Sequence, residues 1–150
     1  MFERADDVRI VRCEGWCAVQ VRDAMTKQVL VVGPEHTIRQ VARQMADRRV
    51  GSAVVHDPDA EGFGIMTERD ILYAIGRGLD PDGERAANHL TWDVVYATPE
   101  WTLEDAAAAM VRGGFRHLVV MDRGDVLGVI SVRDILRVWT RQRTPAATVS

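Results

Sequence analysis

The sequence predicts a mixed α/β (α+β) fold made of two copies of a β-α-β-β-α unit. The first observation is a repeated motif, because GIMTERDIL at residues 64–72 returns as GVISVRDIL at residues 128–136. The second is that short β-branched runs alternate with segments in which apolar residues recur at helical spacing. The third is composition: 47% of the 150 residues are hydrophobic and 27% are charged, as in ordinary globular domains.

The two copies align over most of the chain at a nearly constant offset. An offset of 65 pairs Thr26 with Thr91. From Gly64, which pairs with Gly128, the offset is 64, so the second copy is one residue shorter. We place the missing residue in the loop at residues 57–62. The pattern indicates an internal duplication.

Three short strands are expected in each copy, at β-branched or apolar runs bounded by polar turns. The runs are residues 29–32, 53–56 and 63–66 in the first copy, and residues 94–97, 118–121 and 126–130 in the second. Short strands with helices between them predict a small sheet that is covered by helices on one side.

Two helices are expected in each copy. The apolar positions of the first helix are Ile38, Val41, Ala42 and Met45 in the first copy, and Leu103, Ala106, Ala107 and Met110 in the second. A capping box is predicted at Thr37 with Gln40, and an acidic variant of it at Thr102 with Asp105. The second helix of each copy is expected to begin near residues 68 and 132.

The domain organisation follows from the repeat and from a segment rich in Gly, Asp and Pro at residues 76–85. We expect an N-terminal extension at 1–20, a first motif at 21–78, a linker at 79–87, a second motif at 88–140 and a disordered tail at 141–150.

Charge and hydropathy exclude some function classes. Nineteen basic residues against 22 acidic ones give a net charge of −3, which argues against nucleic-acid binding because such binding needs an excess of positive charge. The charged N-terminus lacks a signal peptide, and no apolar run approaches the roughly 20 residues that span a bilayer. We therefore expect a cytoplasmic protein that makes no membrane contact.

Metal binding and catalysis are not indicated either. The two cysteines, Cys13 and Cys17, have no second pair with which to complete a zinc site, so we expect free thiols and no metal. No Ser/His/Asp or Cys/His constellation recurs at the ends of the expected strands, so we expect no enzyme and no required cofactor.

The repeated motif itself admits two interpretations. Thr67 with Asp70, and Ser131 with Asp134, stand where a strand gives way to a helix, which is typical of a helix cap that contributes about 1 kcal/mol. The same geometry also suits a ligand. A helix N-terminus attracts phosphate or sugar oxygens, and an Asp one turn later can accept both hydroxyls of a ribose.

Two further features favour the ligand interpretation. The glycine that opens each motif permits a close approach to the strand edge. In the second copy Arg116 and His117 occupy the positions that Gly51 and Ser52 hold in the first, and we expect this cation and titratable ring to lie at one cleft only.

The repeat resembles a pair of CBS (cystathionine-β-synthase-type) domains, which pack as a Bateman module. The resemblance covers roughly residues 21–140. It rests on Met25-Thr26, Val29 to Val32, Pro34-x-x-Thr37, Met45, Val54-Val55 and the closing motif, with their counterparts in the second copy. The second copy departs from the pattern in reading Leu90-Thr91 where Met-Thr is usual. The resemblance implies that the two motifs pack through their small sheets with pseudo-twofold symmetry.

The resemblance also implies a set of ligand-binding residues. Asp70 and Asp134 would hold ribose hydroxyls, and Thr67 and Ser131 would contact the ribose or first phosphate. The backbone near Val29 and Val94 would read the adenine edge. The residues implied to enclose the adenine ring are Val31 with Ile65, and Tyr96 with Val129; those implied to contact phosphate are Arg116 and His117.

The function implied is that of a stand-alone regulatory protein that binds AMP, ADP, ATP or S-adenosylmethionine in a cleft between the motifs. Signalling would pass to a protein partner in trans or through self-association, and a homodimer is expected. We expect one occupied site, at the end carrying Arg116 and His117, whose ligand depends on Asp134. The alternative is a dimeric scaffold with empty clefts, in which the repeated Thr/Ser and Asp residues only cap helices.

Overall fold

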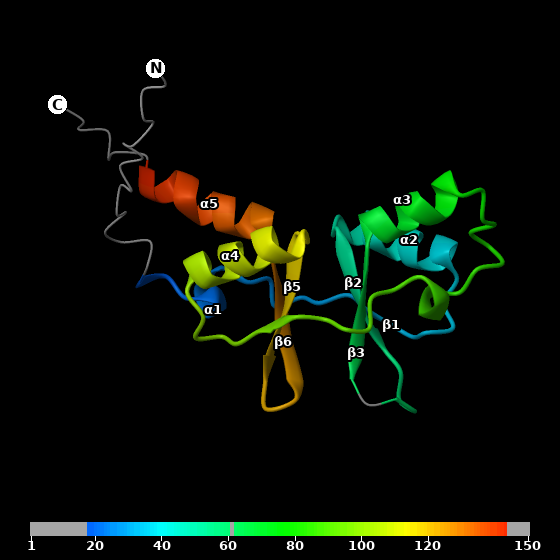
Figure 1. Cartoon of the computed structure of the whole chain (residues 1–150), viewed down its shortest axis with the longest axis horizontal. Coiled ribbons are helices and arrows are strands. Elements are labelled where there is room, and N and C mark those ends of the chain that lie inside the picture. Colours follow the sequence, from blue (N-terminus) through cyan, green and yellow to red (C-terminus); the bar gives the residue numbers. More distant parts are fainter. Residues whose placement is uncertain (1–17, 61, 144–150) are drawn as a thin grey trace, which may run out of the picture.

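Residues 18–60 and 62–143 are described by a computed structural model, and Figure 1 shows them as two lobes, each with a small sheet and two longer helices. The first lobe contains β1 (Val31–Val32), α2 (Ile38–Arg48), β2 (Ser52–His56), β3 (Phe63–Thr67) and α3 (Glu68–Gly76). The second contains β4 (Tyr96–Ala97), α4 (Leu103–Gly113), β5 (His117–Asp122), β6 (Asp125–Ser131) and α5 (Val132–Arg143). A short helix precedes each unit, α1 (Val21–Ala24) and the 3-10 helix η2 (Ala86–Asn88). The predicted β-α-β-β-α order is confirmed in both copies.

The two sheets have the same topology. In each, the first strand runs parallel to the second, and the second pairs antiparallel with the third, giving the orders β1-β2-β3 and β4-β5-β6. The first strands are shorter than the sequence suggests. The N–H of Val29 and that of Val94 donate to carbonyls two residues earlier, those of Lys27 and Trp92, so the chain turns locally before each ladder begins.

The hairpins account for the difference in length between the copies. Six residues separate β2 from β3, whereas β5 and β6 are joined by Arg123 and Gly124 alone. Both of these residues have positive φ, 51° and 91°, as in the tight turns that match the twist of paired strands. The missing residue therefore lies in the hairpin, as predicted.

Reciprocal caps begin the two covering helices. The Thr37 hydroxyl accepts from the Gln40 N–H at 3.2 Å, and the Gln40 side chain accepts from the Thr37 N–H at 2.9 Å. Thr102 and Asp105 form the same box on α4. At the other end of the fold α5 continues to Arg143, so the predicted tail boundary at residue 140 falls inside a helix. The predicted disorder of residues 144–150 lies outside the described residues.

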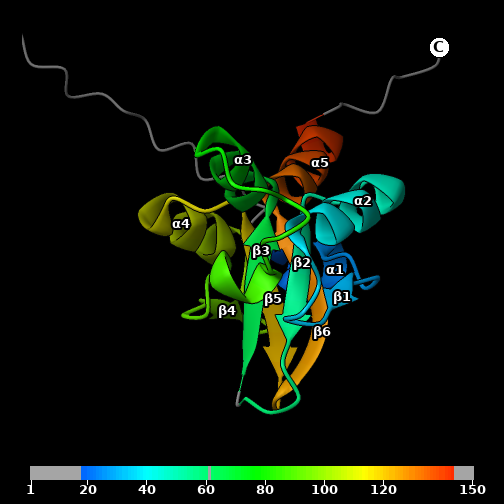
Figure 2. The same ribbon diagram turned by 90° about the vertical axis from the view of Figure 1, so that its right-hand side faces the viewer.

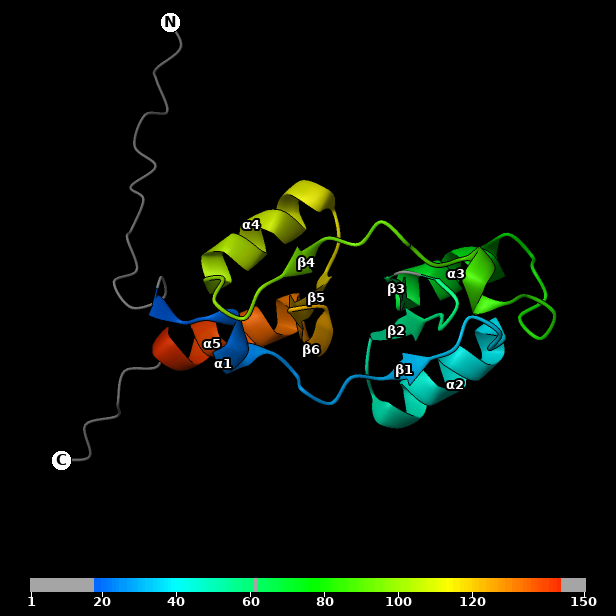
Figure 3. The ribbon, with the colours of Figure 1, turned by 90° about the horizontal axis from the view of Figure 1, so that it is seen from below.

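The segment before each first strand crosses to the opposite lobe. Val21 of α1 is buried in the core cluster that contains Leu103 and Ile135 of the second lobe, whereas Ala86 of η2 is buried in the core of the first. Figure 3 shows α1 beside α5, with the chain running from it across to β1. The two copies therefore complete each other's cores.

A third core cluster joins the two sheets. Its fully packed members are Val54 of β2, Ile65 of β3 and Val119 of β5, which belong to both lobes. Burying such side chains contributes about 1.5–3 kcal/mol each. Figure 2 shows the longer helices gathered at one end of the molecule and the hairpins at the other. The copies thus pack through their sheets, as the resemblance implies.

Candidate ligand-binding clefts

Two clefts lie where the lobes meet, one beside each repeated aspartate. The Asp70 cleft has a volume of about 620 Å³, and the Asp134 cleft has a volume of about 590 Å³. Each combines the strand-to-helix junction of one copy with the crossing segment and the start of the second strand of the other copy. Both therefore require the two motifs together, and neither copy alone would form a complete site.

The predicted site residues are brought together in a different pairing from the one that the sequence suggests. Asp70 and Ile65 share a cleft with Val94, whereas Asp134 and Val129 share a cleft with Val29. The reason is the crossing of the segments between lobes, which carries the residues before each first strand to the other copy's aspartate. Adenine and ribose contacts would thus come from different copies.

Val31 and Tyr96 do not line either cleft. Val31 is 53% exposed, and Tyr96 is 37% exposed with its hydroxyl 3.5 Å from the Phe63 carbonyl oxygen. Alternation along each strand explains this, because the inward positions are Val32 and Ala97. The expectation that these two side chains enclose an adenine ring is therefore not supported by their positions.

Asp70 stands at the third position of α3. Its Oδ2 accepts two hydrogen bonds from Thr67, from the N–H at 2.7 Å and from the hydroxyl at 2.9 Å. Within residues 18–60 and 62–143, nothing is recorded as donating to its second carboxylate oxygen. One oxygen of Asp70 thus holds the helix cap, and the other is available to a donor in the cleft.

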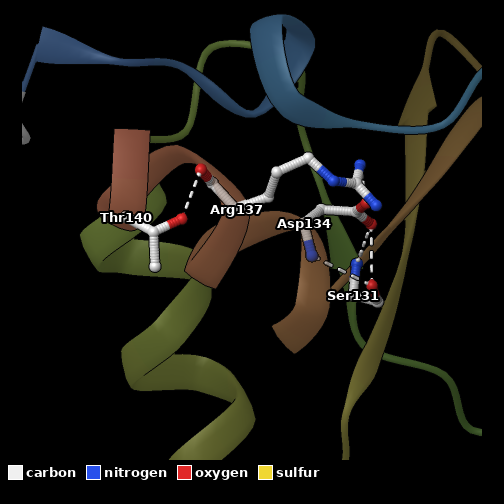
Figure 4. Close-up of polar contacts among 4 residues, drawn as sticks. All are labelled: Ser131, Asp134, Arg137 and Thr140. Carbon is white, nitrogen blue, oxygen red and sulfur yellow. Dashed lines mark hydrogen bonds and ion pairs between the residues drawn. The ribbon is translucent and has the colours of Figure 1, made fainter. Parts of the chain in front are cut away.

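Asp134 has the same cap and an additional partner (Figure 4). Its Oδ2 accepts from the N–H and the hydroxyl of Ser131, both at 2.8 Å, while Oδ1 accepts from an Arg137 Nη1–H at 3.2 Å. The Asp134 side chain is only 7% exposed, whereas that of Arg137 is 51% exposed. The backbone carbonyl of Arg137 accepts from the Thr140 hydroxyl at 3.1 Å one turn later. A ligand hydroxyl at Oδ1 would have to share this oxygen with a half-exposed guanidinium.

The capping interpretation is thus confirmed as local geometry, and it leaves room for the ligand interpretation. Asp105 on α4 makes an equivalent cap with Thr102, at 3.2 Å to its N–H and 2.7 Å to its hydroxyl, yet lines neither cleft. Among the described residues, the capping boxes at Gln20, Thr37 and Thr102 line neither cleft, whereas those at Thr67 and Ser131 open into the clefts. Only the position of Asp70 and Asp134 distinguishes them.

Arg116 and His117 line both clefts, not one as the sequence suggests. His117 begins β5 and Arg116 directly precedes it, and Glu68 of α3 is the third residue common to the two linings. A Cβ added at Gly51 would lie 3.1 Å from His117 Nε2 and 2.8 Å from Glu68 Oε1, so these side chains meet above Gly51. The absence of a side chain at Gly51 makes room for them.

The His117 ring sits in a poorly solvated place. Burial lowers the pKa of His117, and the nearby Arg116 and Arg133 act in the same direction, while Glu68 and Asp134 oppose them. Its Nδ1 is buried and has no hydrogen-bond partner within the described part of the chain. The lowered pKa favours the uncharged ring at neutral pH, so Arg116 is the permanent cation that the two clefts share.

Several lining residues were not singled out from the sequence. They are Arg69, Asp93, Val95 and Phe115 in the Asp70 cleft, and Gln28, Arg49, Arg133 and Arg137 in the Asp134 cleft. Two signals could have found some of them. Arg137 follows Asp134 at helical spacing, and Gln28 and Asp93 are counterparts at the repeat offset of 65. Arg49 required the structure, because it ends α2 and reaches the cleft from the other copy.

Within residues 18–60 and 62–143, no three His, Cys, Asp or Glu side chains gather closely enough to hold a metal ion. Cys13 and Cys17 lie outside that part of the chain. None of the helices described has the length and apolar character needed to cross a bilayer.

Comparison with known sequences identifies the repeat. The CBS domain family matches the chain twice, over residues 21–77 and 87–141. An uncharacterized 17.7 kDa protein of Acidianus ambivalens is 37% identical over 122 residues, which are 80% of this chain and 73% of that protein. A protein of Methanocaldococcus jannaschii is 31% identical over 117 residues, and there the chain spans only 41% of the relative's length.

Solved structures share the fold. A CBS domain protein of Pyrobaculum aerophilum in complex with AMP has a TM-score of 0.72 and 29% identity, over 82% of this chain and 99% of that one. The hexameric CBS-CP12 protein of bloom-forming cyanobacteria has a TM-score of 0.75 and 29% identity, over 79% of this chain and 66% of that one. With two matched repeats, the same topology and complementary crossing segments, the chain belongs to the CBS domain family and forms a CBS pair.

Proposed function

We propose that this CBS pair is a regulatory module that binds an adenosine-containing ligand, of the class of AMP, ADP, ATP or S-adenosylmethionine, in the clefts between its motifs. The observation that carries the proposal is the placement of Asp70 and Asp134. Each closes a helix cap with one oxygen and turns the other toward a cleft of about 600 Å³. Such a carboxylate can accept two hydroxyl donors from a ribose.

The rest of each cleft suits the remaining parts of such a ligand. In the Asp70 cleft the apolar side chains of Ile65, Val94 and Phe115 offer a surface for a flat base. The positive dipole end of α3 points toward the same space and favours electron-rich ligand oxygens there, such as those of a sugar. The AMP complex of the Pyrobaculum relative supports this ligand class.

Signalling is proposed to act through the arrangement of the two lobes. Because each cleft is lined by both copies, a ligand there would bind better to one arrangement of the lobes than to another. The shift that it produces cannot exceed this difference in binding free energy. We propose no catalytic step, and assign the output to a protein partner or to self-association.

Self-association is favoured by exposed apolar side chains on α3. Leu72, Tyr73 and Ile75 are 67%, 61% and 50% exposed, and Leu136 on α5 is 50% exposed. The hexameric cyanobacterial relative shows that a CBS pair can occur within an assembly. We propose that copies of this chain associate as a homodimer through these helices. Sedimentation velocity over a range of concentrations tests this, and a monomer at every concentration would exclude it.

A thermal-unfolding panel with AMP, ADP, ATP and S-adenosylmethionine tests the ligand proposal. A ligand at 100 times its dissociation constant stabilises the folded state by about 2.7 kcal/mol. For a chain of this length that raises the midpoint by roughly 5–10 °C. A rise in the unfolding midpoint with at least one of the four ligands supports the proposal. No rise with any member favours the alternative, a scaffold in which the clefts stay empty.

A further inference from the structure

The internal repeat allows the two clefts to be compared position by position. Counterparts lie 65 residues apart before the hairpin and 64 residues apart after it. The core of each site is nearly the same, since Thr67 and Asp70 correspond to Ser131 and Asp134. The surrounding charged positions differ, and those that line only one of the two clefts make the Asp134 cleft the more positive.

Three substitutions make the Asp134 cleft more positive than its counterpart. Gln28 lies in the Asp134 cleft where Asp93 lies in the Asp70 cleft. Arg49, the residue that ends α2, corresponds to Gly114, which ends α4. The third substitution is on the helix that carries the aspartate, where Arg137 corresponds to Tyr73.

The charged residues that line each cleft add up to opposite signs. Arg69 and Arg116 oppose Glu68, Asp70 and Asp93 in the Asp70 cleft, a balance of −1 with neutral His117. Arg49, Arg116, Arg133 and Arg137 oppose Glu68 and Asp134 in the Asp134 cleft, a balance of +2. Since Arg116 and Glu68 are common to both, the contrast comes from residues that only one cleft possesses.

The two corresponding arginines Arg69 and Arg133 also differ in their hydrogen bonds. Arg69 donates to the Gly114 carbonyl oxygen at 3.0 Å, so part of its hydrogen-bonding capacity is used in joining α3 to α4. Its counterpart Arg133 is exposed on α5 and has no recorded partner within the described part of the chain. Free guanidinium donors in a partly closed site are suited to phosphate oxygens, which they bind in pairs.

Resting on the proposed function, we infer that the two clefts select adenosine ligands of different charge. The Asp134 cleft takes a polyphosphorylated adenosine ligand, whose negative charge its surplus of arginines offsets. The Asp70 cleft takes an adenosine ligand with no net negative charge, such as a nucleoside or a sulfonium derivative, because a phosphate chain there would face Asp93 without the compensating Arg49 and Arg137. The chain would then respond to two classes of ligand at once.

Calorimetric titration of the full chain with ADP and with S-adenosylmethionine tests this inference. The chain itself offers matched variants, in which a residue is exchanged for its counterpart in the other copy. Arg49→Gly removes a cleft charge and is compatible with folding, because Arg49 has a φ of 55° that glycine adopts more readily. Asp93→Gln removes a negative charge from the exposed lining of the Asp70 cleft.

We expect each substitution to weaken the binding of one ligand and to leave the binding of the other nearly unchanged. Arg49→Gly weakens ADP binding about tenfold, as for the loss of one charge-assisted hydrogen bond, and changes S-adenosylmethionine binding less than about twofold. Asp93→Gln weakens S-adenosylmethionine binding severalfold and leaves the tight ADP site unchanged. Asp134→Asn abolishes tight ADP binding, whereas Asp70→Asn abolishes S-adenosylmethionine binding.

Two kinds of failure are distinguishable. ADP binding that is insensitive to Arg49→Gly, or that is lost with Asp70→Asn and kept with Asp134→Asn, overturns the charge assignment while the proposed function stands. Binding of neither ADP nor S-adenosylmethionine to the wild-type chain overturns the charge assignment. If AMP and ATP also fail to bind, the proposed function falls with it.

Discussion

The backbone of Thr26 pairs with the backbone of Val129, more than 100 residues later, through N–H to carbonyl distances of 2.9 and 3.0 Å in the two directions. Thr91 pairs with Ile65 in the same way at 3.0 and 3.1 Å. These two pairs fix the crossing segments to the opposite lobes. They also place Val29 and Val94 beside the aspartate of the other copy, so the clefts depend on them.

The repeated glycine is explained by this pairing, and its substitution should be destabilising. A Cβ at Gly128 would lie 2.7 Å from the Thr26 carbonyl oxygen, which is backbone and cannot rotate away. We predict that Gly128→Ala lowers the free energy of unfolding by about 1–3 kcal/mol, as for overpacking elsewhere. Chemical denaturation monitored by circular dichroism measures the change.

The matched control is Gly76→Ala at the end of α3. A Cβ there would meet no heavy atom within 4 Å, and the backbone is not in the left-handed region. This variant should be neutral or slightly stabilising, since alanine favours helix. Equal effects of the two substitutions would show that the crossing segment does not require the glycine.

Three of the aspartate caps should separate stability from binding. Asp70→Ala, Asp134→Ala and Asp105→Ala each remove a capping carboxylate, at a cost of about 1 kcal/mol in unfolding free energy. Asp134→Ala should cost the most, because the Asp134 side chain is only 7% exposed and also pairs with Arg137. Urea denaturation of the three variants measures this order.

Ligand stabilisation should follow a different order. Asp105 lines neither cleft, so Asp105→Ala should retain the ligand-induced rise in unfolding midpoint seen with the wild-type chain. Asp70→Ala and Asp134→Ala should each lose the rise for the ligand of their own cleft. If both variants kept every ligand-induced rise in unfolding midpoint, the repeated aspartates would serve only as caps.

His117 should make stability depend on pH. Burial, the largest cause, lowers the pKa of His117 below its value in the unfolded chain, so the unfolded state binds more protons between the two pKa values. The free energy of unfolding should therefore fall as the pH drops from about 7 toward 5, since the unfolded pKa is about 6.5. At higher pH the histidine is neutral in both states and has no such effect.

His117→Ser is the matched variant, because Ser52 holds the corresponding position in the first copy. The variant should lose less stability than the wild-type chain between pH 7.5 and 5.5 in parallel denaturation experiments. The comparison isolates His117 from Glu68, Asp134, Arg116 and Arg133, which face the ring and are present in both proteins. Identical pH profiles would show that burial of the ring is not maintained in solution.

Much of the fold could be predicted from the sequence because the repeat is local and strongly patterned. Thr37 with Gln40 predicted a cap that is present, and the strand-to-helix junctions at Thr67 and Ser131 lie where the motif placed them. Local propensity and side-chain spacing determine such features. The first strand of each copy was predicted too long. The chain turns locally at Val29 and Val94 before each strand begins, and these turns occur where the chain crosses between the lobes.

The composition of the clefts was less predictable. Val94 stands beside Asp70 only because a segment crosses between lobes, and nothing in the spacing of one copy encodes that exchange. The side on which Val31 and Tyr96 point depends on register, and a shift of one residue reverses it. Arg116 and His117 reach both clefts because β5 begins at the centre of the molecule, which only the packed structure defines.

The most direct test of the central claim is calorimetric titration of the wild-type chain and of Asp70→Ala, Asp134→Ala and Asp105→Ala with AMP, ADP, ATP and S-adenosylmethionine. We predict saturable binding of at least one ligand, lost on substitution of the aspartate in its cleft and unchanged in Asp105→Ala. Binding that survives both cleft substitutions, or the absence of binding by every ligand to the wild-type chain, would contradict the assignment of these clefts to adenosine ligands.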